Sequence, residues 1–206
     1  PWDVPRSELH RVNWRDLDLP PAYLEGDEAR RVLATKPKHW LGYYEASLWS
    51  NLESPRDYVP ADMTADQVRE INAMTHIENE LIDEACQRVI NYLKAHDVYD
   101  HTDIFFTTDH GELQGDYGLM FKGPYHVDAL MRLPLIWKPG QQAFEPQVID
   151  EPVGHVDLAP TFCAIAGIEP EQMDGRVLPA SADEASHQGR ETTMTEWASE
   201  HGPVNL

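Results

Sequence analysis

The fold is organised around Asp103-Ile-Phe-Phe-Thr-Thr-Asp-His-Gly-Glu112, in which a short apolar run leads directly into a group of polar side chains. The run Ile104–Phe106 is bounded by polar residues on both sides. A run this short, rich in β-branched and aromatic residues, predicts a strand. Its apolar residues do not alternate with polar ones, which is typical of a strand covered on both faces in a parallel sheet. We therefore expect a buried strand here.

The predicted strand is followed by two side chains that can bind a ligand, Asp109 and His110, and then by Gly111. In α/β sheets, ligands bind just beyond the carboxyl ends of the strands. A carboxylate and an imidazole side by side can bind a divalent cation, and a glycine lets the backbone approach a ligand closely. Lys122 lies in the glycine-containing segment that follows, which we expect to be a flexible loop. On these residues alone, an ordinary polar turn is an alternative, because Asp and Gly also favour turns for local reasons.

The longer segment from Thr107 to Trp137 resembles the sulfatase family of the alkaline-phosphatase superfamily. That family carries a D-H/N-G-E segment, then G-D/E-x-G, then K-G and finally R-x-P-L-I. The same motifs occur here in the same order at 109–112, 115–118, 122–123 and 132–136. Residues 155–167 are similar to a later family pattern, D-x-x-P-T-[IL]-x-x-x-[AL]-G. The resemblance therefore extends over most of the chain.

The resemblance implies an α/β fold, a three-layer sandwich with a mixed, mostly parallel sheet of the alkaline-phosphatase type. This fold is expected to be incomplete in this chain. The family's acidic pair, its C/S-x-P-x-R nucleophile motif and its first lysine-containing loop have no counterpart in these residues. We expect residues 1–206 to be a partial sulfatase catalytic domain, with a loop-rich segment over 1–63 and a core of helices and strands over 64–206.

The function that the resemblance implies is metal-dependent hydrolysis of sulfuric esters by a longer enzyme, in which this chain is a segment that is inactive alone. Asp109 and His110 would bind a divalent metal, usually Ca²⁺ in such sulfatases, with Mg²⁺ and Mn²⁺ left open. Lys122 would bind the sulfate as a point charge and offset charge on the leaving oxygen. His126 would assist proton transfer, and Glu112 would hydrogen-bond behind the metal ligands.

Two other functions are left open. One is a phosphonate monoester or phosphodiester hydrolase of the same superfamily, which the histidine at position 110 favours, because relatives with that chemistry often carry Asp-His. The other is a non-catalytic remnant domain that keeps the fold and binds or scaffolds. Comparing the rates of hydrolysis of sulfate, phosphonate and phosphodiester substrates would distinguish such a hydrolase from a sulfatase. Measuring metal binding would distinguish the non-catalytic remnant from both enzymes.

Composition bounds the partners of this chain. It carries 36 acidic and 16 basic side chains in 206 residues, for a formal net charge of −20. This balance argues against nucleic acid, which requires clusters of Lys and Arg, and disfavours anionic membrane surfaces. We expect a small anionic sulfate ester as the partner, with no nucleic acid and no membrane; a homo-oligomer and the compartment are left open. Cys86 and Cys163 are expected to be buried free thiols.

The remaining sequence predicts further helices and strands. Thr64 and Gln67 form a capping-box pattern at the start of a long helix that is expected to end near 95–97. Its buried face should carry residues at three- or four-residue spacing: Val68, Ile71, Met74, Ile77, Leu81, Ala85, Val89 and Leu93. Further strands are predicted at 133–138, 148–153 and 192–197, and further helices at 28–35, 127–131 and 158–166, the last capped by Asp157.

One cluster has two interpretations. Residues 36–44 combine Lys36, Lys38 and His39 with Trp40 and Tyr43-Tyr44. They could line a substrate cleft, or they could form a solvated loop over a core, with the lysine stems lying along apolar surface.

Overall fold

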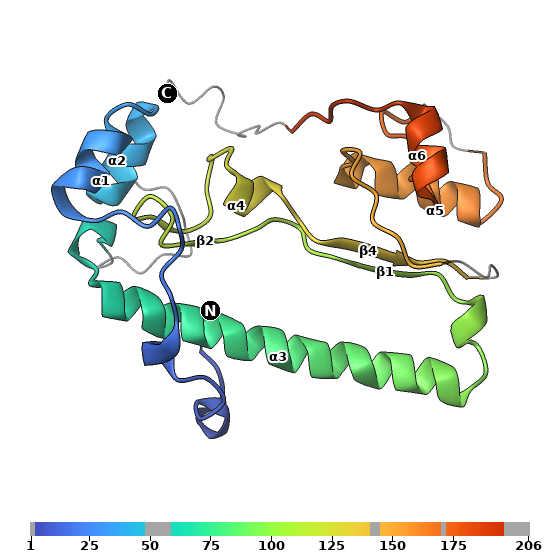
Figure 1. The fold of residues 1–206 in the computed structure, drawn as a ribbon, viewed down its shortest axis with the longest axis horizontal. Helices are drawn as coiled ribbons and strands as arrows, with labels where there is room; N and C mark the ends of the chain where they lie inside the picture. Colours follow the sequence, from blue (N-terminus) through green and yellow to red (C-terminus); the bar gives the residue numbers. More distant parts are fainter. Residues whose placement is uncertain (1–2, 48–58, 141–144, 170–171, 196–206) are drawn as a thin grey trace. The chain divides into compact units, whose positions relative to one another are not determined.

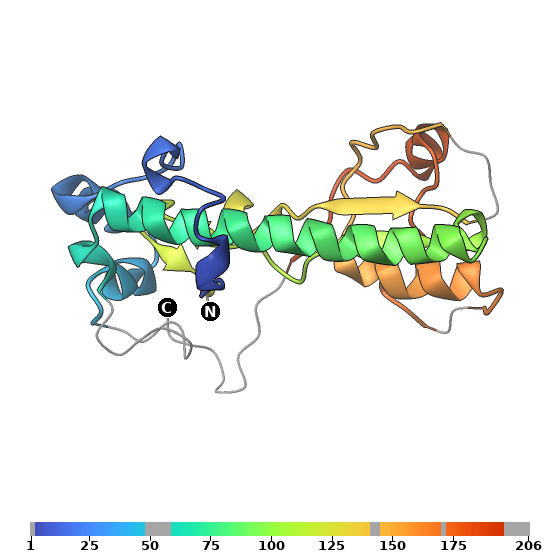
Figure 2. The same cartoon turned by 90° about the horizontal axis from the view of Figure 1, so that it is seen from below.

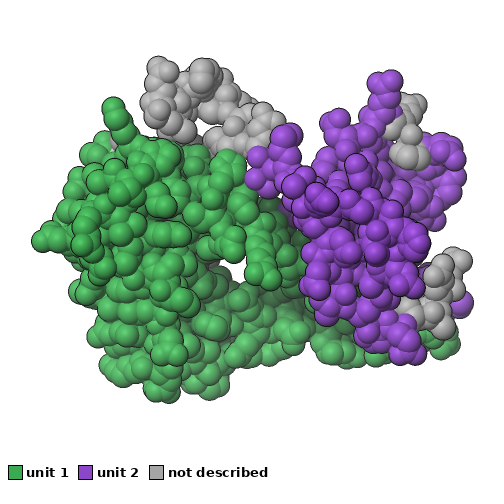
Figure 3. Space-filling model, turned by 45° about the horizontal axis from the view of Figure 1, so that its top comes forward, with its two compact units in different colours: residues 1–100, 104–137, 198–206 green, residues 101–103, 138–197 purple. Residues whose placement is uncertain are grey.

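A computed structural model describes residues 3–47, 59–140, 145–169 and 172–195 (Figure 1). The chain divides into two compact units. Unit 1 comprises residues 1–100, 104–137 and 198–206, and unit 2 comprises residues 101–103 and 138–197 (Figure 3). Across the described part, no helix combines the length and the apolar character that crossing a membrane requires. All residues predicted for the catalytic or metal site belong to unit 1.

Helix α3 (Ala65–Ala95) begins and ends where the sequence predicts (Figures 1 and 2). The Thr64 hydroxyl accepts from the Gln67 N–H at 3.3 Å, and the Gln67 side chain accepts from the Thr64 N–H at 2.9 Å. Val68 and Ile77 are buried as expected, but Val89 is 60% exposed, so its predicted burial is wrong for this chain. The spacing shows only that a face is suited to burial, and the contacts of α3 with η2 (Trp14–Asp16) and β2 (Leu113–Gln114) lie along its first half.

The core of unit 1 forms between two short helices and a hairpin. The helices are α1 (Gly26–Leu33) and α2 (Lys38–Tyr44), which contact each other. Their buried residues pack with those of the hairpin region: Ala29, Leu33, Trp40, Tyr43, Tyr44, Leu113, Leu119, Tyr125 and Leu130. The cluster at 36–44 is therefore a helix whose aromatic side chains build the core, and not a solvated loop. The α1 helix agrees with the predicted helix near 28–35, whereas α2 was not predicted.

Strands β2 (Leu113–Gln114) and β3 (Met120–Phe121) pair antiparallel, with Leu113 opposite Phe121. The flexible loop expected here is instead a packed turn. Gly118 has φ 75°, and a Cβ there would lie 2.6 Å from the Leu24 carbonyl oxygen. Gly118 therefore allows this turn to pack closely against the backbone at Leu24, and it is not a sign of a flexible loop. The Asn72 side chain of α3 donates to the Gln114 carbonyl at 3.0 Å and fastens the hairpin to the long helix.

The predicted strand after α3 is β1 (Ile104–Thr107), and it pairs with β4 (Leu135–Lys138), the strand predicted at 133–138 (Figure 1). Phe105 and Trp137 stack with ring centroids 5.2 Å apart. Burial is only partial, because Phe106 is 41% exposed and Ile136 is 62% exposed. The expectation of a fully covered strand is thus wrong for the described chain. The apolar runs suit a larger sheet than these two strands supply.

Unit 2 contains α5 (Leu158–Ile165) and α6 (Ala182–Gln188). The helix α5 agrees with the prediction, and Gly167 beyond its end has φ 67°, as a glycine that terminates a helix should. No strand forms at 148–153, and residues 192–195 are not a strand either, while 196–197 lie outside the described residues. The two thiols are free as predicted, but Cys86 and Cys163 are half-buried and not fully buried.

Short helices complete the described elements: η1 (Arg6–Glu8), η3 (Pro60–Asp62), η4 (Tyr99–His101), α4 (Asp128–Met131) and η5 (His155–Asp157). Asp157 stands at the N-cap position of α5, but its carboxylate does not cap that helix. It accepts instead from the backbone N–H groups of Gly154 and Arg176, at 2.8 Å each. It also pairs with both terminal nitrogens of Arg190. The predicted capping bond from Asp157 to the helix is therefore wrong.

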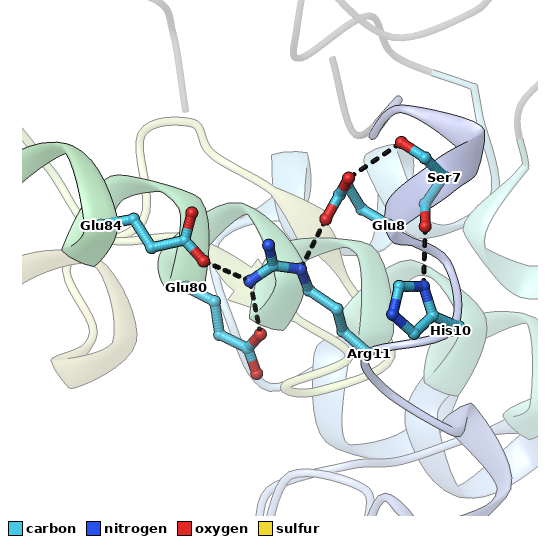
Figure 4. Close-up of polar contacts among 6 residues, drawn as sticks. All are labelled: Ser7, Glu8, His10, Arg11, Glu80 and Glu84. Atoms are coloured by element: carbon cyan, nitrogen blue, oxygen red, sulfur yellow. Dashed lines mark hydrogen bonds and ion pairs between the residues drawn. The ribbon is translucent and has the colours of Figure 1, made fainter.

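The guanidinium group of Arg11 links the N-terminal segment to α3 (Figure 4). Arg11 contacts Glu8 at 2.6 Å, Glu84 at 2.6 Å and Glu80 at 3.3 Å. Hydrogen bonds from the Ser7 hydroxyl and Arg11 lower the pKa of Glu8, and the hydrogen bonds that Arg11 donates to Glu84 and Glu8 raise the pKa of Arg11. Because two of these carboxylates lie on α3 and one lies on η1, the arginine links segments far apart in the sequence.

Replacing Arg11 with Ala should loosen the part of this segment around η1 from α3 without unfolding unit 1, because Arg69 of α3 still holds the Leu17 carbonyl. We expect faster amide exchange over residues 6–12 and a small change in melting temperature, because exposed ion pairs contribute little to global stability. Hydrogen exchange followed by mass spectrometry measures this effect. Arg6→Ala is the matched control, since Arg6 has the same charge but makes no ion pair among the described residues. Equal exchange in the two variants would contradict the link.

Candidate active site

Asp109 and His110 lie in the loop that directly follows β1, as the sequence predicts. The Asp109 carboxylate accepts from the His110 N–H at 3.0 Å and from the Thr108 hydroxyl at 3.3 Å. The carboxylate is 82% exposed. Its slight burial raises the pKa of Asp109, but the nearby His110 and these hydrogen bonds outweigh that effect and lower the pKa overall. Asp109 is therefore a charged, accessible carboxylate near neutral pH.

The ring nitrogens of His110 have different partners. Nδ1 lies 2.8 Å from the Gly111 carbonyl oxygen, and because a carbonyl only accepts, Nδ1 carries the proton in this contact. In the neutral ring, Nε2 is then the unprotonated nitrogen that can bind a metal. Nε2 lies 3.4 Å from Oδ2 of Asp109. Two ligands at about 2.4 Å from one cation, at a right angle, would be about 3.4 Å apart. The pair thus fits two neighbouring positions around a divalent metal.

Gly111 fixes this loop against α4. Its N–H donates to the Leu130 carbonyl at 3.0 Å. A Cβ on Gly111 would lie 1.9 Å from the Ala129 carbonyl oxygen and 2.9 Å from Cα of Leu130. The close backbone approach inferred from sequence is therefore present, but it is an approach to α4. The position of Asp109 and His110 depends on this contact.

Glu112 lies near the imidazole of His110, and the role expected for it stays a prediction. Oε2 of Glu112 lies 3.9 Å from Nδ1 of His110, which is longer than a hydrogen bond. The Gly111 carbonyl is the acceptor that orients the imidazole. Sequence reasoning missed this carbonyl, because a backbone group leaves no residue-type signal. It also missed Thr108, whose hydroxyl reaches both the Asp109 carboxylate and the His110 carbonyl, although a threonine just before Asp is a common local hydrogen-bonding pattern.

Lys122 and His126 lie on the segment between β3 and α4. Lys122 is half-buried directly after β3, and the residue before it, Phe121, has φ 70°. A bulky residue in the left-handed region is strained, and such strain gathers at functional loops. His126 is exposed, two residues before α4. The two pairs of predicted site residues are connected through α4, which follows the Lys122 segment and contacts the Asp109 loop.

A complete metal site does not form from the described residues. Among them, no group of three or more His, Cys, Asp or Glu side chains could hold a metal ion. A Ca²⁺ ion takes about six to eight ligands, mostly oxygens, so the carboxylate of Asp109 and the imidazole nitrogen of His110 could supply at most a few of them. The chemistry of the donors is right for a divalent cation, and the number of donors is too small.

A pocket of about 450 Å³ lies elsewhere in unit 1, beside α1 and α2. It is lined by Leu33, Ala34, Lys36, Lys38, Leu41, Gly42, Glu45 and Ser47. None of the predicted site residues lines it. The candidate site is therefore identified from its side chains and their backbone contacts, and this pocket is not part of it.

Solved structures define the class of fold. The chain is similar to the phosphonate monoester hydrolase SpPMH from Silicibacter pomeroyi, with a TM-score of 0.70, 26% identity and coverage of 95% of this chain and 36% of that one. It is also similar to the phosphonate monoester hydrolase of Agrobacterium radiobacter, with a TM-score of 0.67 and 22% identity over 86% of this chain and 34% of that one. The described helices and small sheets are thus an incomplete α/β domain of the alkaline-phosphatase superfamily.

The family follows from sequence comparison. The sulfatase family profile matches residues 51–168, and the chain belongs to the sulfatase family. It is 33% identical over 159 residues to the uncharacterized sulfatase YidJ of Escherichia coli K12, covering 77% of this chain and 29% of that protein. It is 36% identical over 176 residues to the multifunctional alkaline phosphatase superfamily protein PehA of Trinickia caryophylli, covering 84% and 33%. The chain therefore spans about a third of the length of these relatives.

Proposed function

We propose that this chain is the part of a metal-dependent sulfuric ester hydrolase that supplies two metal ligands and one substrate-binding lysine. The observation that carries the proposal is the pair formed by Asp109 and His110, whose Oδ2 and Nε2 atoms lie 3.4 Å apart directly after β1. Membership of the sulfatase family supports the same reaction. The nucleophile and the remaining ligands belong to other parts of the enzyme, so we expect these 206 residues alone to be inactive.

Each residue has a distinct role in the proposed reaction. Asp109 and His110 hold a divalent cation, Ca²⁺ in the first instance, which when bound polarises an oxygen of the ester. Lys122 contacts the sulfate and offsets charge on the leaving oxygen. His126, which is exposed, moves a proton to or from the leaving group. Gly111 and Thr108 orient the two ligands through the hydrogen bonds described above.

Removing the lysine should reduce catalysis strongly. In the complete enzyme, Lys122→Ala is expected to lower kcat/KM for p-nitrophenyl sulfate about a hundredfold, the scale for losing one group that stabilises transition-state charge. Initial-rate measurements test this. Lys94→Ala is the matched control, because Lys94 is an exposed lysine of the same unit on α3. If both variants had the wild-type rate, the role of Lys122 would be refuted.

A phosphonate monoester or phosphodiester hydrolase is the second candidate. The two structural neighbours named above are phosphonate monoester hydrolases, and a relative is described as multifunctional. The kcat/KM values for p-nitrophenyl sulfate, a phenylphosphonate monoester and bis(p-nitrophenyl) phosphate, measured on one enzyme preparation, separate the candidates. The sulfatase proposal requires the highest value for the sulfate ester.

A non-catalytic remnant is the third possibility, and metal binding decides it. Calorimetric titration with Ca²⁺, repeated with Mg²⁺ and Mn²⁺, should show binding to the complete protein that weakens at least about tenfold in Asp109→Ala. Absence of binding together with an unchanged variant would favour the remnant.

A further inference from the structure

Helix α2 contacts the backbone on both sides of Lys122. The Tyr43 hydroxyl donates to the Met120 carbonyl at 3.0 Å, in a contact that is buried. Nε2 of His39 lies 3.1 Å from the Pro124 carbonyl oxygen. These two carbonyls stand two residues before and two residues after Lys122. His39 and Tyr43 are four residues apart on α2, so they lie on one face of the helix.

Packing alone does not explain the histidine. His39 is 9% exposed, and its ring stacks on Tyr125 with centroids 5.4 Å apart and planes 18° apart. Because a carbonyl only accepts, Nε2 donates to Pro124. Nδ1 is buried and has no hydrogen-bond partner among the described residues. A buried polar atom without a partner lowers stability, and a phenylalanine would fill the same space without that cost. What the imidazole adds over such a ring is the hydrogen bond to Pro124.

The segment between the two contacts is already constrained. Phe121 has φ 70°, in the left-handed region that bulky residues avoid. The Tyr125 N–H donates to the Gly123 carbonyl at 2.7 Å, which closes a tight turn just after Lys122. The Tyr125 ring packs edge-on against Trp40 at 4.9 Å. Strain of this kind persists only where the surroundings hold the backbone in place.

We propose that His39 is a positioning residue, which together with Tyr43 holds the backbone of the 120–124 segment so that Lys122 stays directed at the substrate. His39 does not contact the substrate in this scheme; it acts through Lys122. The inference rests on the proposed function, in which Lys122 binds the sulfate. It gives a role to the aromatic cluster of α2, which the reaction described above does not use.

The test uses three variants of the complete enzyme. His39→Phe keeps the ring that stacks on Tyr125 and removes the donor, His39→Gln keeps a donor that can reach Pro124, and Tyr43→Phe removes only the hydroxyl. We expect His39→Phe and Tyr43→Phe each to lower kcat/KM for the sulfate ester about tenfold, because small displacements of a catalytic group have large effects on rate. His39→Gln should retain most of the activity. Equal loss in the Phe and Gln variants at position 39 would overturn the proposal.

A double-mutant cycle distinguishes positioning from general destabilisation. If His39 acts through Lys122, then His39→Phe should have almost no further effect on kcat/KM in a Lys122→Ala background. A further tenfold loss in that background would mean that His39 acts independently of the lysine, and would overturn the proposal.

Amide hydrogen exchange over residues 119–126 provides a readout that does not depend on the reaction. We expect faster exchange in His39→Phe and near wild-type exchange in His39→Gln. If Lys122→Ala proved as active as the wild type, the proposed function would fail, and this measurement would still decide whether His39 holds the segment. Unchanged exchange in His39→Phe would overturn the positioning role in either case.

Discussion

Gly111→Ala is expected to disrupt the candidate site more than removal of any single site side chain. The new Cβ would lie 1.9 Å from the Ala129 carbonyl oxygen, so the Asp109 loop and α4 must move apart. That movement breaks the bond from the Gly111 N–H to the Leu130 carbonyl. We expect a loss of about 3 kcal/mol in the free energy of unfolding, at the upper end of what overpacking costs. Urea unfolding at neutral pH measures it.

The same variant should lose function beyond its loss of stability. A displacement of about 1 Å at a catalytic group can lower the rate about a hundredfold, and here both proposed metal ligands would move together. Ca²⁺ titration and kcat/KM, measured at a temperature where the variant is folded, would show this. The clashing atoms are backbone atoms, so truncating a neighbouring side chain should not restore activity.

Gly154→Ala is the matched control for this substitution. Gly154 also lies outside the helices with a negative φ of −142°, and its Cβ would approach only the Thr193 hydroxyl closely, at 3.0 Å. A side-chain hydroxyl can rotate away, whereas a helix carbonyl cannot. A Gly111→Ala protein with the unfolding midpoint and Ca²⁺ affinity of Gly154→Ala would refute the packing seen between the loop and α4.

The sequence predicts where Asp109 and His110 lie in the fold because the pattern that places them is local. Asp109 and His110 are adjacent, and they follow a recognisable strand, so their common position needs no knowledge of distant contacts. Lys122 is placed by the same motif. The groups that orient them are not predictable in this way, because the Gly111 carbonyl and the α4 backbone carry no residue-type signal.

Burial is where the sequence predictions go wrong. The apolar spacing of α3 and the apolar runs of β1 and β4 predict buried faces, yet Val89 is 60% exposed and Ile136 is 62% exposed. Periodicity reports which face can be buried, and it does not report whether the covering element lies within the same 206 residues. Both exposures occur in a chain that spans about a third of its relatives' length.

The aromatic residues of α2 show a second kind of feature that the sequence does not predict. Lys, His, Trp and Tyr close together suggest a cleft lining or a solvated loop, and no helix was predicted because the charged and aromatic residues here show no sustained period. In the fold, Pro37 is the N-cap residue of α2, and Trp40, Tyr43 and Tyr44 are core residues. These side chains are buried because α1 and the hairpin region pack against them, and non-local contacts of this kind leave no mark in local sequence spacing.

Arg190→Met should destabilise unit 2 by about 3 kcal/mol at neutral pH, the scale for removing one partner of a buried ion pair. The Asp157 side chain is 1% exposed and that of Arg190 is 14% exposed. Without the guanidinium, the buried carboxylate keeps the N–H groups of Gly154 and Arg176 but has no countercharge. Amide exchange of α5, which begins at the next residue, measures the loss.

The effect should depend on pH in a direction that the structure fixes. Burial raises the pKa of Asp157, but Arg190 and the two backbone N–H groups outweigh it, so the folded pKa lies below its ordinary value. A depressed carboxyl pKa stabilises the fold fully above the unfolded value of about 3.9, and this stabilisation is lost as pH falls through the folded value. The difference in stability between wild type and Arg190→Met should therefore be largest near neutral pH and shrink in acid, as the Asp157 carboxylate becomes protonated.

Arg176→Met is the control that isolates the side-chain charge of Arg190. Both substitutions remove one positive charge from unit 2, but Arg176 is exposed and donates to Asp157 only through its backbone N–H, which methionine keeps. We expect Arg176→Met to change the exchange of α5 amides little at any pH. If the two variants lost equal stability with the same pH dependence, net charge would be the cause, and the paired Asp157 carboxylate would not be what holds η5, α5 and the segment around Arg176 together.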